Sequence, residues 1–158
     1  MKTLLLLRHA KSQNLTPGST DLERPLKESG MKQAQAVGLW LKEQGLMPDL
    51  VLCSTATRAR ATTEIVLRAA ELSAVVHYEQ AIYEGGPGEI LQLIANIANN
   101  GNTVLLVGHN PGMEELVRLL TDRSETISTC TLAKITFATG ELTQLAPGTG
   151  VLEQLVRP

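Results

Sequence analysis

Two arginines and two histidines follow the ends of apolar runs in this 158-residue sequence. "LLLLRH" places Arg8 and His9 directly after four leucines, and "TVLLVGH" places His109 directly after another apolar run. Arg58 lies just beyond a third run, "LVLCS", which ends at Ser54. A guanidinium group binds phosphoryl oxygens in a bidentate fork, and an imidazole can act as a nucleophile. These residue types therefore indicate phosphoryl chemistry, provided that the fold brings them together.

The three apolar runs predict strands that meet at one edge of a sheet. Residues 3–7, 50–53 and 103–108 are continuously apolar, a pattern typical of parallel strands buried on both faces. Ligands of open α/β folds bind beyond the carboxyl ends of such strands. At an effective dielectric near 20, a cation about 4 Å from a unit negative charge gains roughly 4 kcal/mol. Several cations with helix N-termini beside them suit a dianionic phosphoryl group better than a carboxylate. Neither histidine has HxxxH or HExxH spacing, so a metal site is less favoured.

Further patterns predict the elements that hold these strands. Residues 74–78 form a weaker strand candidate, and 133–139 and 152–156 predict antiparallel or edge strands around a hairpin loop at 146–150. Helical periodicity covers 30–45, 56–72, 88–100 and 110–122, with Asn110 as a cap and Pro111 in the first turn of the last helix. The residues expected to face the core are Met31, Ala34, Val37, Gly38 and Leu41; Ala61, Ile65, Ala69 and Leu72; Ile90, Leu93, Ile94 and Ile97; and Leu116, Val117 and Leu120.

Strands that alternate with helices predict an α/β protein built from right-handed βαβ units. We expect a three-layer α/β/α sandwich with a mostly parallel central sheet and antiparallel C-terminal edge strands. The length favours one domain over residues 1–158.

The composition is that of a soluble globular protein, with 43% hydrophobic and 19% charged residues. The net charge of -2 argues against a nucleic-acid partner. No apolar run approaches the roughly 18 residues that a membrane span needs, and the N-terminal run is too short for a signal peptide. Two distant cysteines, Cys53 and Cys130, predict reduced thiols and a cytoplasmic location.

At this point the motifs resemble a known family. "LRHAKS" (7–12), "D-x-x-RPL" (21–26), "CSTATRARATT" (53–63) and "VGHNPGMEEL" (107–116) resemble the histidine phosphatase superfamily. Within it they look most like the short, SixA-like phosphohistidine phosphatases. The combination is highly specific, whereas "RHA" alone would be weak.

The resemblance implies a two-step phosphoryl transfer without a metal or cofactor. His9 would be the nucleophile, and Arg8, Arg58 and His109 would hold the phosphoryl oxygens. Nucleophilic attack needs a neutral His9, and the neighbouring arginines disfavour its protonation. His109 would serve best protonated, which contact with phosphate favours.

The roles of several other residues near the predicted site are left open by the sequence. Ser12 could donate its hydroxyl to phosphate or cap a loop, and Lys11 adds a cation beside the pocket. Larger relatives carry a general acid after a later strand. Glu84 lies in this region and could be that acid or a solvated loop residue, and Glu89 is a less favoured candidate. Ala10 stands where the wider family often has glycine, so the loop could differ slightly.

Five remaining residues are expected to be structural. Asp21 and Arg24 should pair to shape a loop over the site, while His77 and Trp40 should pack. Cys53 should be a small buried hydrophobe.

The resemblance therefore implies a metal-independent phosphatase whose substrate is phosphohistidine on a protein. Short connections leave little room for a large lid, and an open site would admit a protein side chain. The alternatives are a phosphatase of small phosphate esters or sugar phosphates, a non-catalytic module that binds phosphorylated partners, and a zinc or iron site formed by His9, His109 and Glu84. The sequence leaves the oligomeric state open.

Overall fold

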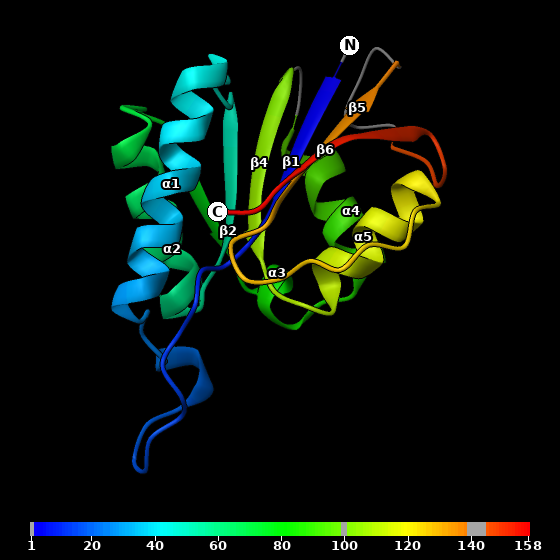
Figure 1. Cartoon of the computed structure of the whole chain (residues 1–158). Helices are drawn as coiled ribbons and strands as arrows, with labels where there is room; N and C mark the ends of the chain where they lie inside the picture. Colours follow the sequence, from blue (N-terminus) through cyan, green and yellow to red (C-terminus); the bar gives the residue numbers. More distant parts are fainter. Residues whose placement is uncertain (1, 99–100, 139–144) are drawn as a thin grey trace.

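The structure is a computed structural model that describes residues 2–98, 101–138 and 145–158. Figure 1 shows a sheet seen nearly edge-on, with helices on both sides of it. In chain order the elements are β1 (Lys2–Arg8), the 3-10 helix η1 (Asp21–Glu23), α1 (Glu28–Gln44), β2 (Leu50–Ser54), α2 (Thr57–Ala69), β3 (Val76–Glu79), α3 (Gln80–Glu84), α4 (Pro87–Ile97), β4 (Thr103–Gly108), α5 (Gly112–Thr121), β5 (Leu132–Phe137) and β6 (Gly150–Val156).

The sheet has the strand order β3-β2-β4-β1-β5-β6. The strands β1 to β4 are parallel, β5 is antiparallel to β1, and β6 is antiparallel to β5. This arrangement confirms the predicted α/β sandwich with a mostly parallel sheet and antiparallel C-terminal strands. The register pairs Arg8 with Gly108, so β1 and β4 end side by side.

The leucine run of β1 serves both faces of the sheet. Leu4 and Leu6 belong to the core beneath α4 and α5, whereas Leu5 and Leu7 belong to the core beneath α1 and α2. All four side chains are fully buried, because β1 lies between β4 and β5 with a helical layer on each face. A strand buried in this way needs apolar residues at every position, not at alternate ones.

The four helices lie where the sequence predicted them, although the start of α5 and part of the predicted core faces differ. On α1, Met31 is exposed while Ala34, Val37, Gly38 and Leu41 are buried as expected. On α4, Ile90 and Ile94 are buried, and Leu93 and Ile97 pack at the edge of the core. On α5, Leu116, Val117 and Leu120 are buried as expected.

The predicted stripe of α2 lies at the edge of the core, and a neighbouring face of the helix is the one fully buried. Ala61, Ile65, Ala69 and Leu72 are only partly buried, and the helix instead buries Arg58, Ala59, Thr62, Thr63, Val66 and Leu67. The threonines can face inward because Thr62 donates to the Arg58 carbonyl and Thr63 to the Ala59 carbonyl.

The predicted start of α5 was also wrong. Asn110 does not cap the helix, and Pro111 precedes it rather than forming its first turn. The amide Nδ2 of Asn110 is directed elsewhere, because it donates to the Ile127 carbonyl at 2.7 Å and to Glu114 at 3.0 Å.

The ends of three predicted elements need a further note. Residue 139 of the strand predicted at 133–139, and residues 99–100 of the helix predicted at 88–100, lie outside the described residues. The weak strand candidate at 74–78 is present as β3, shifted to Val76–Glu79.

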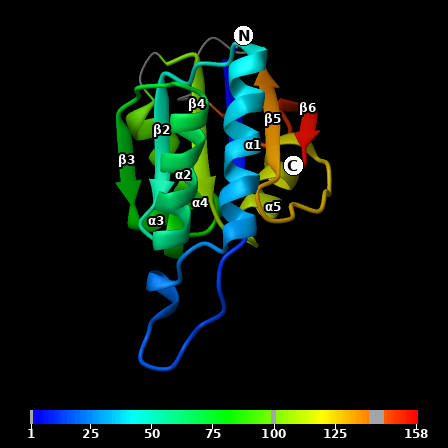
Figure 2. The same ribbon diagram turned by 60° about the vertical axis from the view of Figure 1, so that its left-hand side comes forward.

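The connection between β1 and α1 is longer than the short loops expected around the site. Residues 12–26 of this connection form an arm that projects beyond the carboxyl edge of the sheet (Figures 1 and 2). Its base is closed by an antiparallel bridge between Ser12 and Leu26 and by the bond from Lys27 N to the Lys11 carbonyl. Gly30 of α1 allows this closure, because a Cβ at that position would collide with the Lys11 backbone. The arm carries η1 back toward the sheet.

Candidate active site

The strand ends bring the four candidate residues together, as the sequence predicted. His9 follows β1 and His109 follows β4, and their ring centroids are 5.0 Å apart. The His9 backbone N–H donates to the Gly108 carbonyl at 2.9 Å, which continues the strand pairing to the site. Arg58 lies in the first turn of α2, after β2 ends at Ser54. The site therefore draws on three parallel strands and one helix start.

The imidazole of His9 is held with one nitrogen facing the site. Its Nδ1 lies 2.8 Å from the Ala10 carbonyl, which can only accept, so Nδ1 carries the proton. The other nitrogen, Nε2, then carries the lone pair and accepts from Arg58 Nε at 3.4 Å. Ala10 itself is fully buried with φ outside the positive range, and its N–H donates to Thr62 Oγ1 at 2.9 Å. Alanine thus fits the position where the wider family often has glycine.

Each of the two arginines donates a hydrogen bond to a backbone carbonyl from a different connecting segment. Arg8 Nη1 donates to the Ile127 carbonyl at 3.1 Å, and Arg58 Nη1 donates to the Asp21 carbonyl at 2.8 Å. Arg8 Nε is buried and has no hydrogen-bond partner among the described residues. A buried N–H donor of this kind is suited to an anion, because an unpaired one is costly.

His109 is fixed through the end of β2. Its Nε2 lies 2.7 Å from Ser54 Oγ, and Ser54 Oγ also accepts from the Ala56 N–H at 3.2 Å. The second ring nitrogen, Nδ1, is buried without a partner within residues 2–98, 101–138 and 145–158. His109 can therefore give one nitrogen to Ser54 and offer the other to a ligand.

Both histidines are neutral at neutral pH. Burial, together with the nearby charges of Arg58 and Arg8, lowers the pKa of His9 to about 4 and outweighs the Ala10 hydrogen bond. Burial, with His9 and Arg58 as neighbours, lowers the pKa of His109 to about 3. Burial also lowers the pKa of Arg8. The result is a neutral His9 imidazole beside two guanidinium groups.

Asp21 and Tyr83 complete the site, and neither was predicted to contact it. Asp21 Oδ2 accepts from Arg58 Nη2 at 3.1 Å and from the Tyr83 hydroxyl at 2.6 Å. The Tyr83 ring lies 5.4 Å from the ring of His109. The predicted pair of Asp21 with Arg24 is confirmed at 2.8 Å. The sequence signal was the "D-x-x-RPL" motif, which indicated a loop near the site but not its link to Arg58.

The candidates with two interpretations form no hydrogen bond to the four central residues in the described part of the chain. The hydroxyl of Ser12 accepts from Arg24 Nη1 at 3.0 Å, which matches the loop-holding interpretation. Lys11 has an exposed side chain, and its backbone N–H donates to Gln33 Oε1 at 3.0 Å. Glu84 is exposed at the last residue of α3, and the neighbouring Tyr83 is the α3 side chain that contacts Asp21. The catalytic role of Glu84 stays a prediction.

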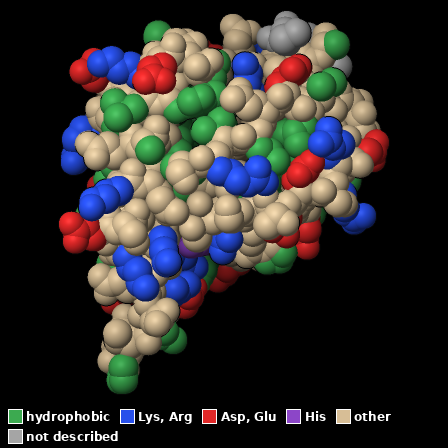
Figure 3. Space-filling view, viewed as in Figure 1, with side chains coloured by type: hydrophobic (Ala, Val, Ile, Leu, Met, Phe, Trp, Pro, Cys, Tyr) green, Lys and Arg blue, Asp and Glu red, His purple; other side chains and the backbone are tan. Residues whose placement is uncertain are grey.

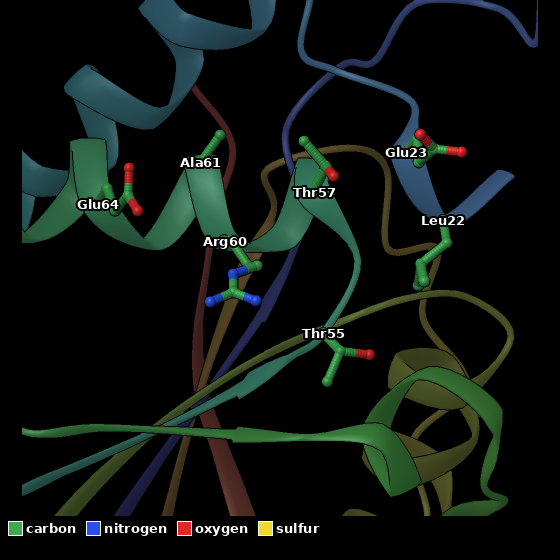
Figure 4. A pocket seen from close by; sticks show the side chains of 7 residues that line it. All are labelled: Leu22, Glu23, Thr55, Thr57, Arg60, Ala61 and Glu64. Atoms are coloured by element: carbon green, nitrogen blue, oxygen red, sulfur yellow. The ribbon is translucent and has the colours of Figure 1, made fainter. Parts of the chain in front are cut away.

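The charge around the site is basic even though the whole chain is slightly acidic. Figure 3 shows histidine surface between several Lys and Arg side chains at the base of the arm. A cavity of about 350 Å³ flanks the site and is lined by Leu22, Glu23, Thr55, Thr57, Arg60, Ala61 and Glu64 (Figure 4). It shares η1 and α2 with the site, but the four candidate residues do not line it. The guanidinium of Arg60 lies over the Tyr78 ring, 4.2 Å from its centroid.

Cys53 and Cys130 are free and buried, and burial raises the pKa of each thiol to about 12.

Within the described residues no three His, Cys, Asp or Glu side chains are close enough to form a metal site. In the same part of the chain, every helix is too short or too polar to cross a bilayer.

Comparisons with known proteins agree with this geometry. Residues 4–93 match the sequence model of the histidine phosphatase superfamily (branch 1). An uncharacterized protein of Mycobacterium tuberculosis is 38% identical over 120 residues, covering 76% of this chain and 73% of that protein.

Solved structures resemble the whole fold. A candidate phosphohistidine phosphatase SixA from Agrobacterium tumefaciens superposes with a TM-score of 0.86 at 29% identity, covering 99% of this chain and 98% of that one. Its counterpart from Nakamurella multipartita gives a TM-score of 0.84 at 30% identity over 99% and 96% of the two chains.

Proposed function

Because this chain belongs to the histidine phosphatase superfamily (branch 1), we propose that it hydrolyses phosphohistidine on proteins, with His9 as the nucleophile. The observation that carries the proposal is the state of His9. Its Nδ1–H is held by the Ala10 carbonyl, its pKa is lowered to about 4, and its Nε2 lone pair faces Arg58.

The reaction has two steps. In the first, His9 Nε2 attacks phosphorus, a new P–N bond forms, and the P–N bond of the substrate breaks. In the second, water attacks phosphorus, the bond to His9 breaks, and inorganic phosphate leaves. Negative charge grows on the phosphoryl oxygens in both steps, where Arg8 Nε, Arg58 and His109 Nδ1 supply donors.

His109 changes its charge when the anion binds. Its pKa of about 3 in the free protein makes it neutral, but a dianion beside its unpaired Nδ1 stabilises the imidazolium and raises that pKa. His109 then contributes a charge-assisted hydrogen bond.

The leaving group favours phosphohistidine over an alkyl ester. An alkoxide needs a proton as it leaves, whereas an imidazole protonated on its other nitrogen leaves as a neutral ring. The carboxylate in contact with Arg58 is Asp21, and the hydrogen bond from Tyr83, with Arg24 and Arg58, holds the pKa of Asp21 well below its usual range. Asp21 is therefore a poor proton donor, which suits a substrate that does not need one.

The surroundings of the site are compatible with a protein substrate. The arm extends beside the phosphoryl site, so a polypeptide that carries the phosphorylated side chain has surface to contact. The similarity to proteins described as phosphohistidine phosphatases supports the same substrate.

A trapping experiment tests the mechanism. The protein is mixed with a ³²P-phosphohistidine peptide, quenched in alkali, and mapped by proteolysis. Label that is alkali-stable, acid-labile and located on His9 is expected, and His9→Ala should carry none. His77→Ala, which removes a partly buried histidine of β3, is the matched control and should label normally. Turnover without label on His9, or equal label in His9→Ala, would sink the mechanism.

Substrate class is tested separately by comparing kcat/KM for a phosphohistidine peptide, an aryl phosphate and a sugar phosphate in the presence of a chelator. The peptide should be preferred and the sugar phosphate poorest. Preference for the sugar phosphate would instead support a small-molecule phosphatase, and loss of all activity on chelation would support a metal site.

A further inference from the structure

The carboxylate of Asp21 is the meeting point of three side chains from different parts of the fold. Its Oδ1 accepts from Arg24 Nε at 2.8 Å, and its Oδ2 accepts from Tyr83 at 2.6 Å and from Arg58 Nη2 at 3.1 Å. Arg24 belongs to the arm, Tyr83 to α3 and Arg58 to α2. Asp21 itself lies in η1, so the arm is fastened to the body of the protein at the candidate active site.

The contacts of Asp21 occupy one particular edge of the Arg58 guanidinium. The backbone oxygen of Asp21 accepts from Nη1 at 2.8 Å while its carboxylate accepts from Nη2, so both lie at the far end of the fork. The other edge is formed by Nε and the second hydrogen of Nη2, and its Nε donates to His9, so this edge faces the nucleophile. Nε on that edge lies 3.4 Å from His9 Nε2. A guanidinium held at its far end presents its lateral edge to the atom that receives the phosphoryl group.

Tyr83 and Arg24 fix the Asp21 carboxylate itself. A carboxylate that meets only one arginine could rotate, whereas this one accepts on both oxygens. The Tyr83 ring also faces the Arg58 guanidinium at 5.9 Å, so Tyr83 limits the movement of both partners. The orientation of Arg58 is thus set by atoms that do not touch its reactive edge.

We propose that Asp21 is a positioning residue for catalysis, which acts by holding the far edge of Arg58 so that the lateral edge faces the phosphoryl group on its way to His9. The inference rests on the proposed function, because it assumes that His9 receives a phosphoryl group. It predicts that Asp21 matters more for the transition state, in which charge on the oxygens is largest, than for the ground state.

The perturbation is Asp21→Asn, which keeps the shape of the side chain and one acceptor oxygen. Since Asp21 is 47% exposed, the variant should fold, and its melting temperature verifies this. Glu23→Gln is the matched control, because Glu23 lies in the same 3-10 helix and its carboxylate accepts from Thr20 rather than from Arg58.

Turnover of an aryl phosphate is measured first. Asp21→Asn should lower kcat about 10- to 100-fold with little change in KM, since a displacement near 1 Å can cost about 100-fold. Glu23→Gln should stay within about two-fold of wild type. Equal losses in both variants would mean that Asp21 only maintains the arm, and would overturn the inference.

Binding of vanadate and of inorganic phosphate is measured next, because it does not depend on turnover. Asp21→Asn should weaken vanadate, which resembles the transition state, by about the factor lost in kcat, and weaken phosphate only a few-fold. In the background of Arg58→Gln, Asp21→Asn should not weaken vanadate further. Equal weakening of both anions, or an additive loss without Arg58, would overturn the positioning role.

These binding results separate the two proposals. If wild type carries no label on His9 in the trapping experiment, the proposed function fails, whatever Asp21→Asn does to vanadate. If His9 is labelled but vanadate binds Asp21→Asn as tightly as wild type, only the role of Asp21 fails.

Discussion

Acidification from pH 7.0 to 4.5 should destabilise the wild-type protein by about 2 kcal/mol more than it destabilises the His9→Gln variant. The pKa of His9 is lowered from 6.5 to about 4 in the folded protein, chiefly by burial and then by Arg58 and Arg8. Between these values the unfolded chain binds a proton at His9 and the folded protein does not. The stability associated with a neutral His9 is therefore present above pH 6.5 and is lost as the pH falls toward 4.

The magnitude follows from the same values. Within the window, one proton taken up only by the unfolded state costs about 1.4 kcal/mol per pH unit. Partial titration at both ends leaves about 2 kcal/mol over the interval. Solvent screening weakens this little, because His9 is only 6% exposed. His9→Gln removes this titration, while His109 and the carboxylates titrate in both proteins.

The assay is urea denaturation at pH 7.0, 6.0, 5.2 and 4.5, followed by circular dichroism. The quantity compared is the difference in unfolding free energy between the two proteins at each pH, so a constant cost of the substitution cancels. The unfolding free energy of wild type minus that of His9→Gln should fall steadily as the pH falls. Parallel stability curves would refute the argument, because they would mean that folding does not shift the titration of His9 and that its neutrality does not come from the site.

Three further outcomes are expected. Leu105→Ala, at a fully buried position of β4, should lower the unfolding free energy by about 2–5 kcal/mol. Leu39→Ala, on the exposed side of α1, should change it by at most about 0.5 kcal/mol. Urea denaturation measures both values, and equal losses would contradict the assigned burial. Gly30→Ala should destabilise by about 1–3 kcal/mol, because its Cβ would collide with the Lys11 backbone; a variant as stable as wild type would contradict that close approach. Saturating inorganic phosphate should raise the pKa of His109 above its free value of about 3, as followed by NMR titration, and an unchanged value with phosphate bound would show that the anion lies elsewhere.

The convergence of the site was predictable because strand direction and burial leave few choices. Continuous apolar runs required strands buried on both faces, and parallel strands put their carboxyl ends at one edge. Arg8, His9 and His109 then had to lie together, as they do. Arg58 followed from its position in the first turn after β2.

What the sequence did not predict depends on hydrogen bonds between polar groups, which the periodicity of apolar residues does not reveal. Thr62 faces inward on α2 because it accepts from the Ala10 N–H, and periodicity of apolar residues cannot register such a bond. Asp21 and Tyr83 are distant in sequence and meet only through tertiary folding. The projection of the arm likewise depends on the pairing of Ser12 with Leu26, which has no apolar pattern of its own.

The strand that carries His9 and the arm beside it should differ in local stability, because β1 is paired with a strand on each side. Amide hydrogens of β1 are bonded on both sides of the strand, so they should exchange with solvent only when the whole domain unfolds. The arm is attached through its base and through Asp21, so it can open in a smaller fluctuation. We therefore expect a protease to cleave the arm while the rest of the domain is still folded, with His9 and His109 in their native positions.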